Sequence, residues 1–204
     1  VGGHVASDGL ALGNLAKTGH KGGALAVIGD DPWNDSTQVP ADSRFLARHL
    51  AIPVMEPATF QEIKDWIKIA FELSKRSDFY ITYLVTTNLA DGGGTVKVFP
   101  NIYPVINRNE TIELITADIP VDKTVILPPR TTQQENTFKE RRRLLHEASR
   151  EFGIDQILYA PKKGKAEIGF ITSGVTYGYL EHALHELNLF SAFPILKLGI
   201  TYPI

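Results

Sequence analysis

The fold is indicated most strongly by one stretch, Ala24-Leu25-Ala26-Val27-Ile28-Gly29-Asp30-Asp31-Pro32, in which an apolar run ends at a glycine and two acids. A continuous apolar run is typical of a strand in a parallel sheet, because helices cover both faces of such a strand. Open sheets of this class bind their ligands at the carboxyl ends of the strands. We therefore predict a central strand at 24–28 and a binding site where it ends.

Residues 30–44 form the first candidate site, because this segment is longer and more polar than a simple connection requires. Besides acids, its polar residues include Ser36, Gln38, Ser43 and Arg44. Long ordered loops in compact domains are usually functional. Asp30 and Asp31 are candidates for a metal-binding or acid–base pair, although an Asp-Asp-Pro sequence after a strand more often orders a turn.

Arg44 has two interpretations. Its guanidinium is a planar fork of donors, which would bind the carboxylate of a substrate or orient the edge of a cofactor. Alternatively, Arg44 pairs with Asp30, Asp31 or Asp42 and holds the loop in place. Both interpretations stay open from the sequence alone.

The composition limits the classes of protein to be considered. The chain has 204 residues, 43% apolar residues, a net charge of −2 and no cysteine. These values are typical of a globular protein and give no reason to expect nucleic-acid binding or an anionic membrane as partner. Without cysteine the chain holds no disulfide, zinc–thiolate site or iron–sulfur ligand. We expect a cytoplasmic protein without a membrane span, since its apolar runs are far shorter than the ~20 residues that a bilayer requires.

Residues 1–95 alternate helix and strand signals, which predicts a parallel α/β sheet with crossover helices. Thr59-Phe60-Gln61-Glu62 is a capping box, and apolar residues then recur at helical spacing as far as Leu73. The other expected elements are a helix at 6–17, a short helix from Asp42 or Ser43 to His49, and strands at 24–28, 52–55 and 79–86.

The first residues, Val1 to His4, are expected to be the end of a strand that enters a loop through Gly2 and Gly3. His4 is then either a proton carrier near the reacting atoms or a surface histidine. Because the chain begins in this way and without methionine, we expect it to be an internal piece of a longer polypeptide.

Residues 96–165 are expected to be a linker that wraps the first domain, with a hairpin in its irregular first part. A second capping box, Thr137-Phe138-Lys139-Glu140, predicts a charged helix that ends near Phe152. Its basic run, Lys139 with Arg141-Arg142-Arg143, is interpreted as a solvated and ion-paired face, because glutamates interleave with it.

Residues 166–204 are expected to begin a second α/β unit. It consists of a strand at 168–172, a helix capped by Ser173-Gly174 and a strand at 195–198. The expected buried stripe of the helix is Leu180, Ala183, Leu184 and Leu187. His182 and His185 on this helix have a spacing that two metal ligands use, but no third ligand matches, so an ordinary helix surface is preferred.

The order and spacing of several short motifs resemble the alpha subunit of indolepyruvate ferredoxin oxidoreductases. Around the predicted site these motifs are Gly29-Asp30-Asp31-Pro32, Ser36, Gln38 and Asp42-Ser43-Arg44. Elsewhere they are Val1-Gly2, Val5-Ala6, Asp8, Thr18-Gly19, Gly22-Gly23, Ile52-Pro53, Glu56-Pro57, Gln61-Glu62, Ala70-Phe71-Glu72-Leu73-Ser74, Thr86-Thr87, Phe170-Ile171-Thr172-Ser173-Gly174-Val175, Tyr177, Leu198-Gly199 and Tyr202-Pro203. The resemblance covers nearly the whole chain except about residues 96–135.

The resemblance implies a thiamine diphosphate and Mg²⁺ enzyme that oxidatively decarboxylates an aryl 2-oxo acid. Such enzymes pass electrons through iron–sulfur clusters to ferredoxin and form an acyl-CoA. Residues 1–95 then resemble the later part of a pyrimidine-binding-like α/β domain, 96–165 a linker with a charged helix, and 166–204 the start of a transketolase-C-terminal-like α/β domain. The implied pocket residues are Gly3, His4, Asp31, Ser36, Gln38, Ser43 and Arg44.

The remaining parts of such an enzyme are expected outside this chain. The glutamate that protonates the aminopyrimidine is expected upstream of Val1, and the diphosphate site, its Mg²⁺ ligands and the iron–sulfur clusters elsewhere. The expected partners are the 2-oxo acid, CoA, ferredoxin and a beta subunit or the remaining domains, in an oligomer. The run Lys162-Lys163-Gly164-Lys165 would meet the phosphates of CoA or the acidic face of ferredoxin, or is simply an exposed loop.

Three positions depart from the family pattern and leave alternatives open. His4 stands where relatives commonly carry Asn, and Asn88 and Asp91 replace an Arg and a His after the Thr86-Thr87 pair. One alternative is a non-catalytic α/β interaction module that keeps the fold. Another is a thiamine-dependent decarboxylase that passes no electrons.

Overall fold

The computed structural model describes residues 2–19, 22–33, 37–101, 115–118, 120–121, 125–161, 164 and 166–204. In chain order the elements are α1 (Gly2–Val5), α2 (Ser7–Ala16), β1 (Leu25–Asp30), α3 (Ser43–His49), β2 (Val54–Met55), α4 (Phe60–Ser77), β3 (Ile81–Thr86), α5 (Thr87–Ala90), η1 (Thr116–Asp118), α7 (Arg130–Glu135), α8 (Phe138–Phe152), β4 (Gln156–Leu158), β5 (Phe170–Ser173), α9 (Gly174–Glu186), β6 (Ile195–Leu198) and β7 (Ile200–Tyr202). Helices and strands alternate along most of the chain, which confirms the predicted α/β class.

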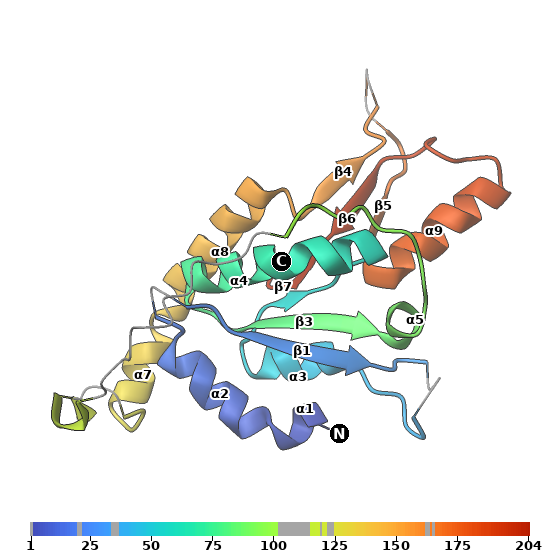
Figure 1. Cartoon of the computed structure of the whole chain (residues 1–204). Helices are drawn as coiled ribbons and strands as arrows, with labels where there is room; N and C mark the ends of the chain where they lie inside the picture. The colour runs from blue at the N-terminus through green and yellow to red at the C-terminus, as the bar shows by residue number, and fades with distance from the viewer. Residues whose placement is uncertain are drawn as a thin grey trace.

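The first sheet has the strand order β1-β3-β2-β7. β1 and β2 both pair with β3 in parallel, and β7 pairs with β2 antiparallel. Helix α4 lies on one face of this sheet, and α1, α2 and α3 lie on the other (Figure 1). The main core forms where α4 and α8 pack on the sheet, around Trp66, Leu73, Tyr83 and Leu145. A smaller cluster on the opposite face joins Ala47 of α3 to Val54 and Leu84.

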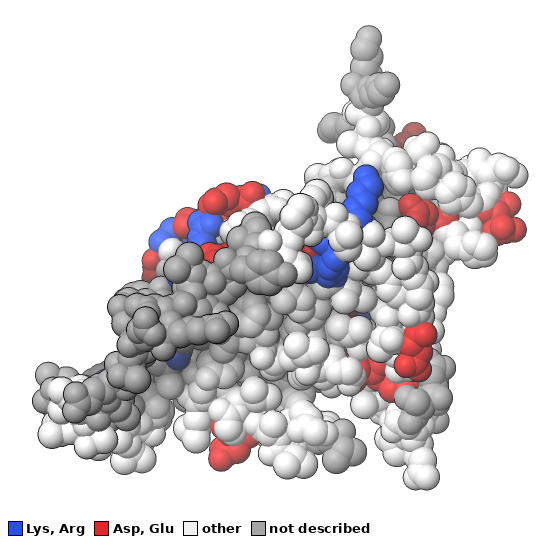
Figure 2. All heavy atoms as spheres, in the orientation of Figure 1, with Lys and Arg blue, Asp and Glu red and all other residues white. Residues whose placement is uncertain are grey.

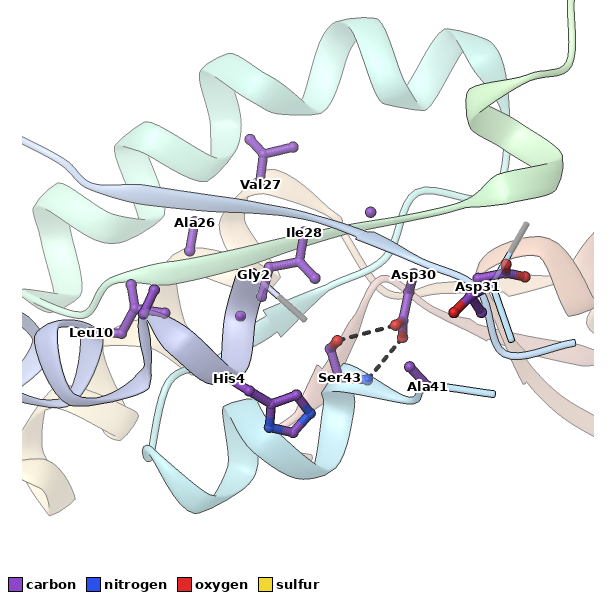
Figure 3. A pocket seen from close by; sticks show the side chains of 14 residues that line it. Gly2, His4, Leu10, Ala26, Val27, Ile28, Asp30, Asp31, Ala41 and Ser43 are labelled. Atoms are coloured by element: carbon purple, nitrogen blue, oxygen red, sulfur yellow. Dashed lines mark hydrogen bonds between the residues drawn. The ribbon is translucent and has the colours of Figure 1, made fainter. Parts of the chain in front are cut away.

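β1 is an edge strand among the described residues, so the prediction of a central strand is wrong. Ile28 points toward the side of α1 and α3, whereas Val27 points toward the side of α4 (Figure 3). Val27 is nevertheless 65% exposed, so α4 covers this face of the edge strand only in part. The apolar run predicted the strand correctly, but residue type alone does not report how many neighbours a strand has.

Helix α4 is built as the capping box predicts. The Thr59 hydroxyl accepts a hydrogen bond from the Glu62 amide at 3.2 Å. The Glu62 carboxylate reaches back to the amide of Ala58 at 2.7 Å, one residue before the usual partner. Within the expected stripe, Trp66, Ala70 and Leu73 are buried.

Helix α8 forms where predicted, but it has no capping box. Thr137 has helical backbone angles, and its hydroxyl donates to the carbonyl of Gln134 instead of accepting from α8. The reason is that α7 ends immediately before α8, so the chain is already helical at Thr137. Helix α7 itself was not expected from the sequence, and part of the segment in which a hairpin was expected, including residues 102–114, lies outside the described residues.

The two threonines provide a matched pair for measuring the cap. Thr59→Ala is expected to lower the free energy of unfolding by about 1 kcal/mol, because an amide at the start of α4 loses its acceptor. Thr137→Ala is expected to change it by less than about 0.5 kcal/mol. Urea unfolding of the two variants checks this difference, and equal losses would contradict the assignment of the caps.

The basic run on α8 is only partly a solvated face. Arg143 is exposed and forms ion pairs with Glu140 and Glu147, as predicted. Figure 2 accordingly shows basic and acidic side chains intermingled over α8. Arg141 is buried instead, because its guanidinium passes between α2 and the turn after α4. Its Nη2 donates to the Asn14 carbonyl at 2.9 Å and to the Asp78 carbonyl at 2.5 Å.

The second sheet has the order β4-β6-β5, with β5 and β6 parallel and β4 antiparallel to β6. The predicted strands at 168–172 and 195–198 correspond to β5 and β6, whereas β4 was not predicted. On α9, Tyr177 and Leu184 are buried and Leu180 packs against them. Ala183 and Leu187 are exposed, which corrects the expected stripe.

Gly199 lets the chain pass from β6 in the second sheet to β7 in the first. A Cβ at this position would lie 2.8 Å from the Trp66 ring and 2.9 Å from the Ile154 carbonyl oxygen. The carboxylate of Asp155 accepts the amides of Gly199 and Ile200 at 2.8 and 3.2 Å. The two sheets are thus joined by a tightly packed crossing, and the division of the chain at residues 96 and 166 stays a prediction. Among the described residues, no helix has both the length and the apolar character that crossing a membrane requires.

Candidate functional site

A cavity of about 430 Å³ lies at the carboxyl end of β1, as the rule for open α/β sheets predicts. It is bounded by α1, α2, β1 and the loop that leads into α3 (Figure 3). Four of the predicted site residues line it, namely Gly3, His4, Asp31 and Ser43. Apolar contacts come from Leu10 and Ile28. The structure thus brings together residues from both ends of the segment 2–43.

Asp30 orders this edge of the sheet. Its buried carboxylate accepts the Ser43 amide at 2.8 Å and the Ser43 hydroxyl at 3.1 Å. Its carbonyl accepts the Thr87 hydroxyl at 3.2 Å. The carboxylate therefore fixes the start of α3, and the interpretation of Asp30 as a loop-ordering residue is confirmed. The neighbouring Asp31 is 8% exposed.

Gly3 and His4 lie in a helix, which corrects the prediction that they follow the end of a strand. Residues 2–5 form the single turn α1, which continues almost directly into α2. The side chain of Ser7 donates to the carbonyl of His4 at 2.8 Å and helps to join the two helices. His4 is exposed at the rim of the cavity, on the side of α3 (Figure 3).

The carboxyl ends of β1 and β3 meet, as their parallel pairing requires. Gly29 pairs with Val85 and Asp30 with Thr86. A hollow of about 270 Å³ next to this edge is lined by Asp30, Asp31, Thr87 and Asp91, among others. Asp91, one of the departures from the family pattern, therefore lies at the same edge as the candidate site.

Arg44 faces a different cavity. This second cavity, of about 450 Å³, lies between α3 and the segment after β7 and is lined by Arg44, Phe45, Arg48 and Tyr202, among others. Successive residues of a helix point about 100° apart, so Ser43 and Arg44 at the start of α3 serve different cavities. The predicted site residues are thus divided between two neighbouring spaces.

The guanidinium of Arg44 contacts two acids, Glu56 in a bidentate pair and Asp42 at one atom. Its Nε and Nη2 donate to Oε1 and Oε2 of Glu56 at 2.8 and 2.9 Å. Its Nη1 lies 3.2 Å from Asp42. The hydrogen bond to Glu56 raises the pKa of Arg44 above its ordinary value, so the side chain is always charged. The expected ion pair with Asp42 is confirmed, and the stronger partner, Glu56, was not foreseen.

Of the two remaining predicted pocket residues, one lies away from these cavities and the other lies outside the described residues. Gln38 is exposed in the loop before α3. Ser36 lies outside the described residues, as do Lys162, Lys163 and Lys165 of the basic run. Ser36 and Gln38 therefore stay predictions.

The histidines of α9 are at the surface. The ring of His185 stacks on Phe190 with centroids 3.8 Å apart and planes inclined by 18°. Within the part of the chain that the structure describes, no group of three or more His, Cys, Asp or Glu side chains is placed to hold a metal ion.

No family model matches the chain. Three curated proteins that match its whole length are each named "Indolepyruvate oxidoreductase subunit IorA". Those from Archaeoglobus fulgidus, Methanothermobacter marburgensis and Pyrococcus horikoshii are each 29% identical over 204, 203 and 206 aligned residues. The chain spans only 30% or 31% of the length of these relatives. The resemblance predicted from the sequence is thereby confirmed: the chain is similar, along its full length, to part of the indolepyruvate oxidoreductase subunit IorA.

Proposed function

We propose that this chain forms one wall of the active site of a thiamine diphosphate-dependent oxidoreductase. The reaction is the oxidative decarboxylation of an aryl 2-oxo acid, such as indolepyruvate, to an acyl-CoA with ferredoxin as electron acceptor. The similarity to IorA subunits supports the oxidoreductase class. The observation that carries the site is the position of Arg44, a charged and firmly held guanidinium that lines a cavity beside the carboxyl edge of the sheet.

The cavity at the end of β1 fits one side of a planar heterocycle. Its volume of about 430 Å³ is within the range of about 300–1,000 Å³ that small-molecule sites have. Gly29 leaves space next to the backbone, and Leu10 and Ile28 offer apolar contacts. Asp31 and Ser43 add polar groups at one end. These residues would hold the aminopyrimidine part of thiamine diphosphate, which when bound supplies a carbanionic carbon and an electron sink.

Arg44 binds the carboxylate group of the 2-oxo acid. Charge-assisted hydrogen bonds from a guanidinium to a carboxylate are short and directional, so they fix the orientation of the bond that breaks when CO₂ leaves. The contribution of this chain is thus to bind and orient the substrate.

The other functions of the enzyme belong to parts beyond these 204 residues. The chain has no cysteine, so the iron–sulfur clusters are held elsewhere in the enzyme. The Mg²⁺ and diphosphate ligands, the activating glutamate and the contacts to CoA and ferredoxin are likewise assigned to the remaining domains or to a beta subunit, in an oligomer. This division accords with the share of the relatives that the chain covers.

The proposal is tested by Arg44→Ala in the full-length enzyme. We expect kcat/KM for indolepyruvate to fall about 100-fold, equivalent to about 2.7 kcal/mol, because the substrate carboxylate loses its charged partner. Arg44→Lys keeps the charge without the fork and is expected to recover part of this loss.

Arg48→Ala is the matched control, because Arg48 lines the same cavity one turn further along α3. It is expected to change kcat/KM less than about threefold. A thermal melt of each variant separates loss of function from loss of folded protein. If folded Arg44→Ala turns over indolepyruvate as fast as the unmodified enzyme, Arg44 has only the structural role that its ion pairs suggest.

A further inference from the structure

The carboxylate of Glu56 lies at a junction of elements from both halves of the chain. Glu56 follows β2 directly and is 2% exposed. Arg44 approaches it from α3, and the hydroxyl of Thr201 donates to it from β7. A buried carboxylate is costly unless charges and donors surround it, and here both surround it. No part of the proposed reaction yet uses this group.

The contact with Glu56 defines the orientation of the Arg44 guanidinium. Nε and Nη2 donate in parallel to the two carboxylate oxygens, at 2.8 and 2.9 Å. Such a bidentate pair fixes the plane of the guanidinium as well as its position. A guanidinium has five N–H groups; two of them point to Glu56 and one on Nη1 faces Asp42, so Nη1 and Nη2 each keep one further N–H group. The side chain of Arg44 is still 32% exposed and lines the 450 Å³ cavity.

The C-terminal part of the chain holds Glu56 in turn. The amide of Glu56 donates to the Gly199 carbonyl at 2.8 Å, in addition to the Thr201 contact. At the start of α9, Gly174 has a φ of +49°, and a Cβ there would lie 3.0 Å from Oε2 of Glu56. The α9 N-terminus can approach the carboxylate this closely because residue 174 is a glycine.

We propose that Glu56 is the positioning residue for Arg44: it holds the guanidinium with its outer N–H groups toward the cavity, where they bind the carboxylate of an anionic substrate. Thr201 and the Gly199 carbonyl hold Glu56, and the α9 N-terminus packs beside its carboxylate, so the binding geometry depends on the docking of residues 170–202 against α3 and β2. The proposal rests on the proposed function, because it requires Arg44 to bind the substrate.

The test is Glu56→Gln in the full-length enzyme with indolepyruvate. Glutamine keeps the shape of the side chain but offers one acceptor oxygen and no charge, so the bidentate contact is lost. We expect KM to rise about tenfold while kcat changes less than about threefold. Inhibition by a substrate analogue with a carboxamide in place of the carboxylate is expected to stay unchanged. A general structural defect would weaken the binding of both the substrate and the carboxamide analogue.

Asp42→Asn is the matched control. It removes the other carboxylate beside Arg44, at 34% side-chain exposure, and asparagine still caps α3 well. We expect KM to change less than about twofold, since exposed ion pairs contribute little. Thr201→Val removes the hydroxyl that supports Glu56 and keeps the side-chain shape, and it is expected to raise KM about threefold. This variant keeps the proposal testable if Glu56→Gln does not fold.

The outcomes separate the two proposals. A large loss in Arg44→Ala together with unchanged KM in Glu56→Gln and Thr201→Val would overturn the positioning role and leave the proposed function intact. No loss in Arg44→Ala would overturn both. The role of Glu56 is supported if Glu56→Gln raises KM for indolepyruvate tenfold and leaves inhibition by the carboxamide analogue unchanged, while Asp42→Asn does not raise KM.

Discussion

Arg141→Ala is expected to lower the free energy of unfolding by about 4 kcal/mol. The substitution leaves the carbonyls of Asn14 and Asp78 without their buried donor, and each unpaired buried group costs about 1–3 kcal/mol. It also removes the guanidinium from the rings of Phe79 and Phe138, whose centroids lie 4.0 and 5.0 Å from it. The measurement is urea unfolding of the protein.

The matched control is Arg143→Ala, two positions further along the same helix. Arg143 is 53% exposed and pairs with glutamates on the surface, so its removal is expected to cost less than about 0.5 kcal/mol. Equal losses in the two variants would contradict the assignment of Arg141 as a buried clamp between α2, α8 and the turn at Asp78.

Burial at this site also changes the ionisation of Arg141. Desolvation lowers the pKa of its guanidinium to about 10. The unfolded chain therefore binds the proton of this guanidinium more tightly than the folded protein does. At neutral pH, burying the charged side chain of Arg141 thus costs free energy on folding. Arg141→Met, which keeps the apolar contacts and removes the charge, is therefore expected to lose only about half as much as Arg141→Ala.

Lys197→Met is expected to lower the free energy of unfolding by about 3 kcal/mol. Lys197 on β6 forms an ion pair with Glu62 on α4, with side-chain exposures of 6% and 14%. Its ammonium also lies 4.6 Å from the centroid of the Tyr177 ring. Removing one member of a buried pair leaves the other charge without compensation, which costs about 3–5 kcal/mol.

Lys64→Met is the control for this variant, because Lys64 pairs with Asp65 on the surface of the same helix. It is expected to change the unfolding free energy by less than about 0.5 kcal/mol. The double variant Lys197→Met/Glu62→Gln is expected to recover part of the loss, since no charge stays buried alone and glutamine also serves in a capping box. A double variant that is no more stable than Lys197→Met would argue against uncompensated charge as the cause.

The sequence predicted those parts of the fold that depend on local signals. Helix α4 was predicted because its cap and its apolar stripe are both contained within 59–73. The edge position of β1 was not predicted, because it depends on which other strands lie beside β1 in the folded sheet. The burial of Arg141 was missed for a similar reason, since Asn14 and Asp78 become its partners only after the chain folds.

The candidate site shows the same division. The rule that strand ends build sites placed Asp31 and Ser43 at one cavity correctly. Arg44 was assigned to the same pocket by its proximity in sequence, but the turn of α3 directs it to the neighbouring cavity. Glu56 was noticed only as part of a family motif, because its role depends on contacts with α3 and β7 that no local pattern encodes.

The pairing of β2 with β7 has a consequence for how the protein reaches its native state. Val54 pairs with Tyr202, so most of these 204 residues lie between two strands that are adjacent in the sheet. Closing a loop of this length costs entropy, and folds that depend on such distant contacts form slowly. During synthesis on the ribosome, one edge of β2 stays unpaired until β7 has emerged. An unpaired strand edge can associate with other chains. Chaperone binding and aggregation are therefore expected to concentrate in that interval.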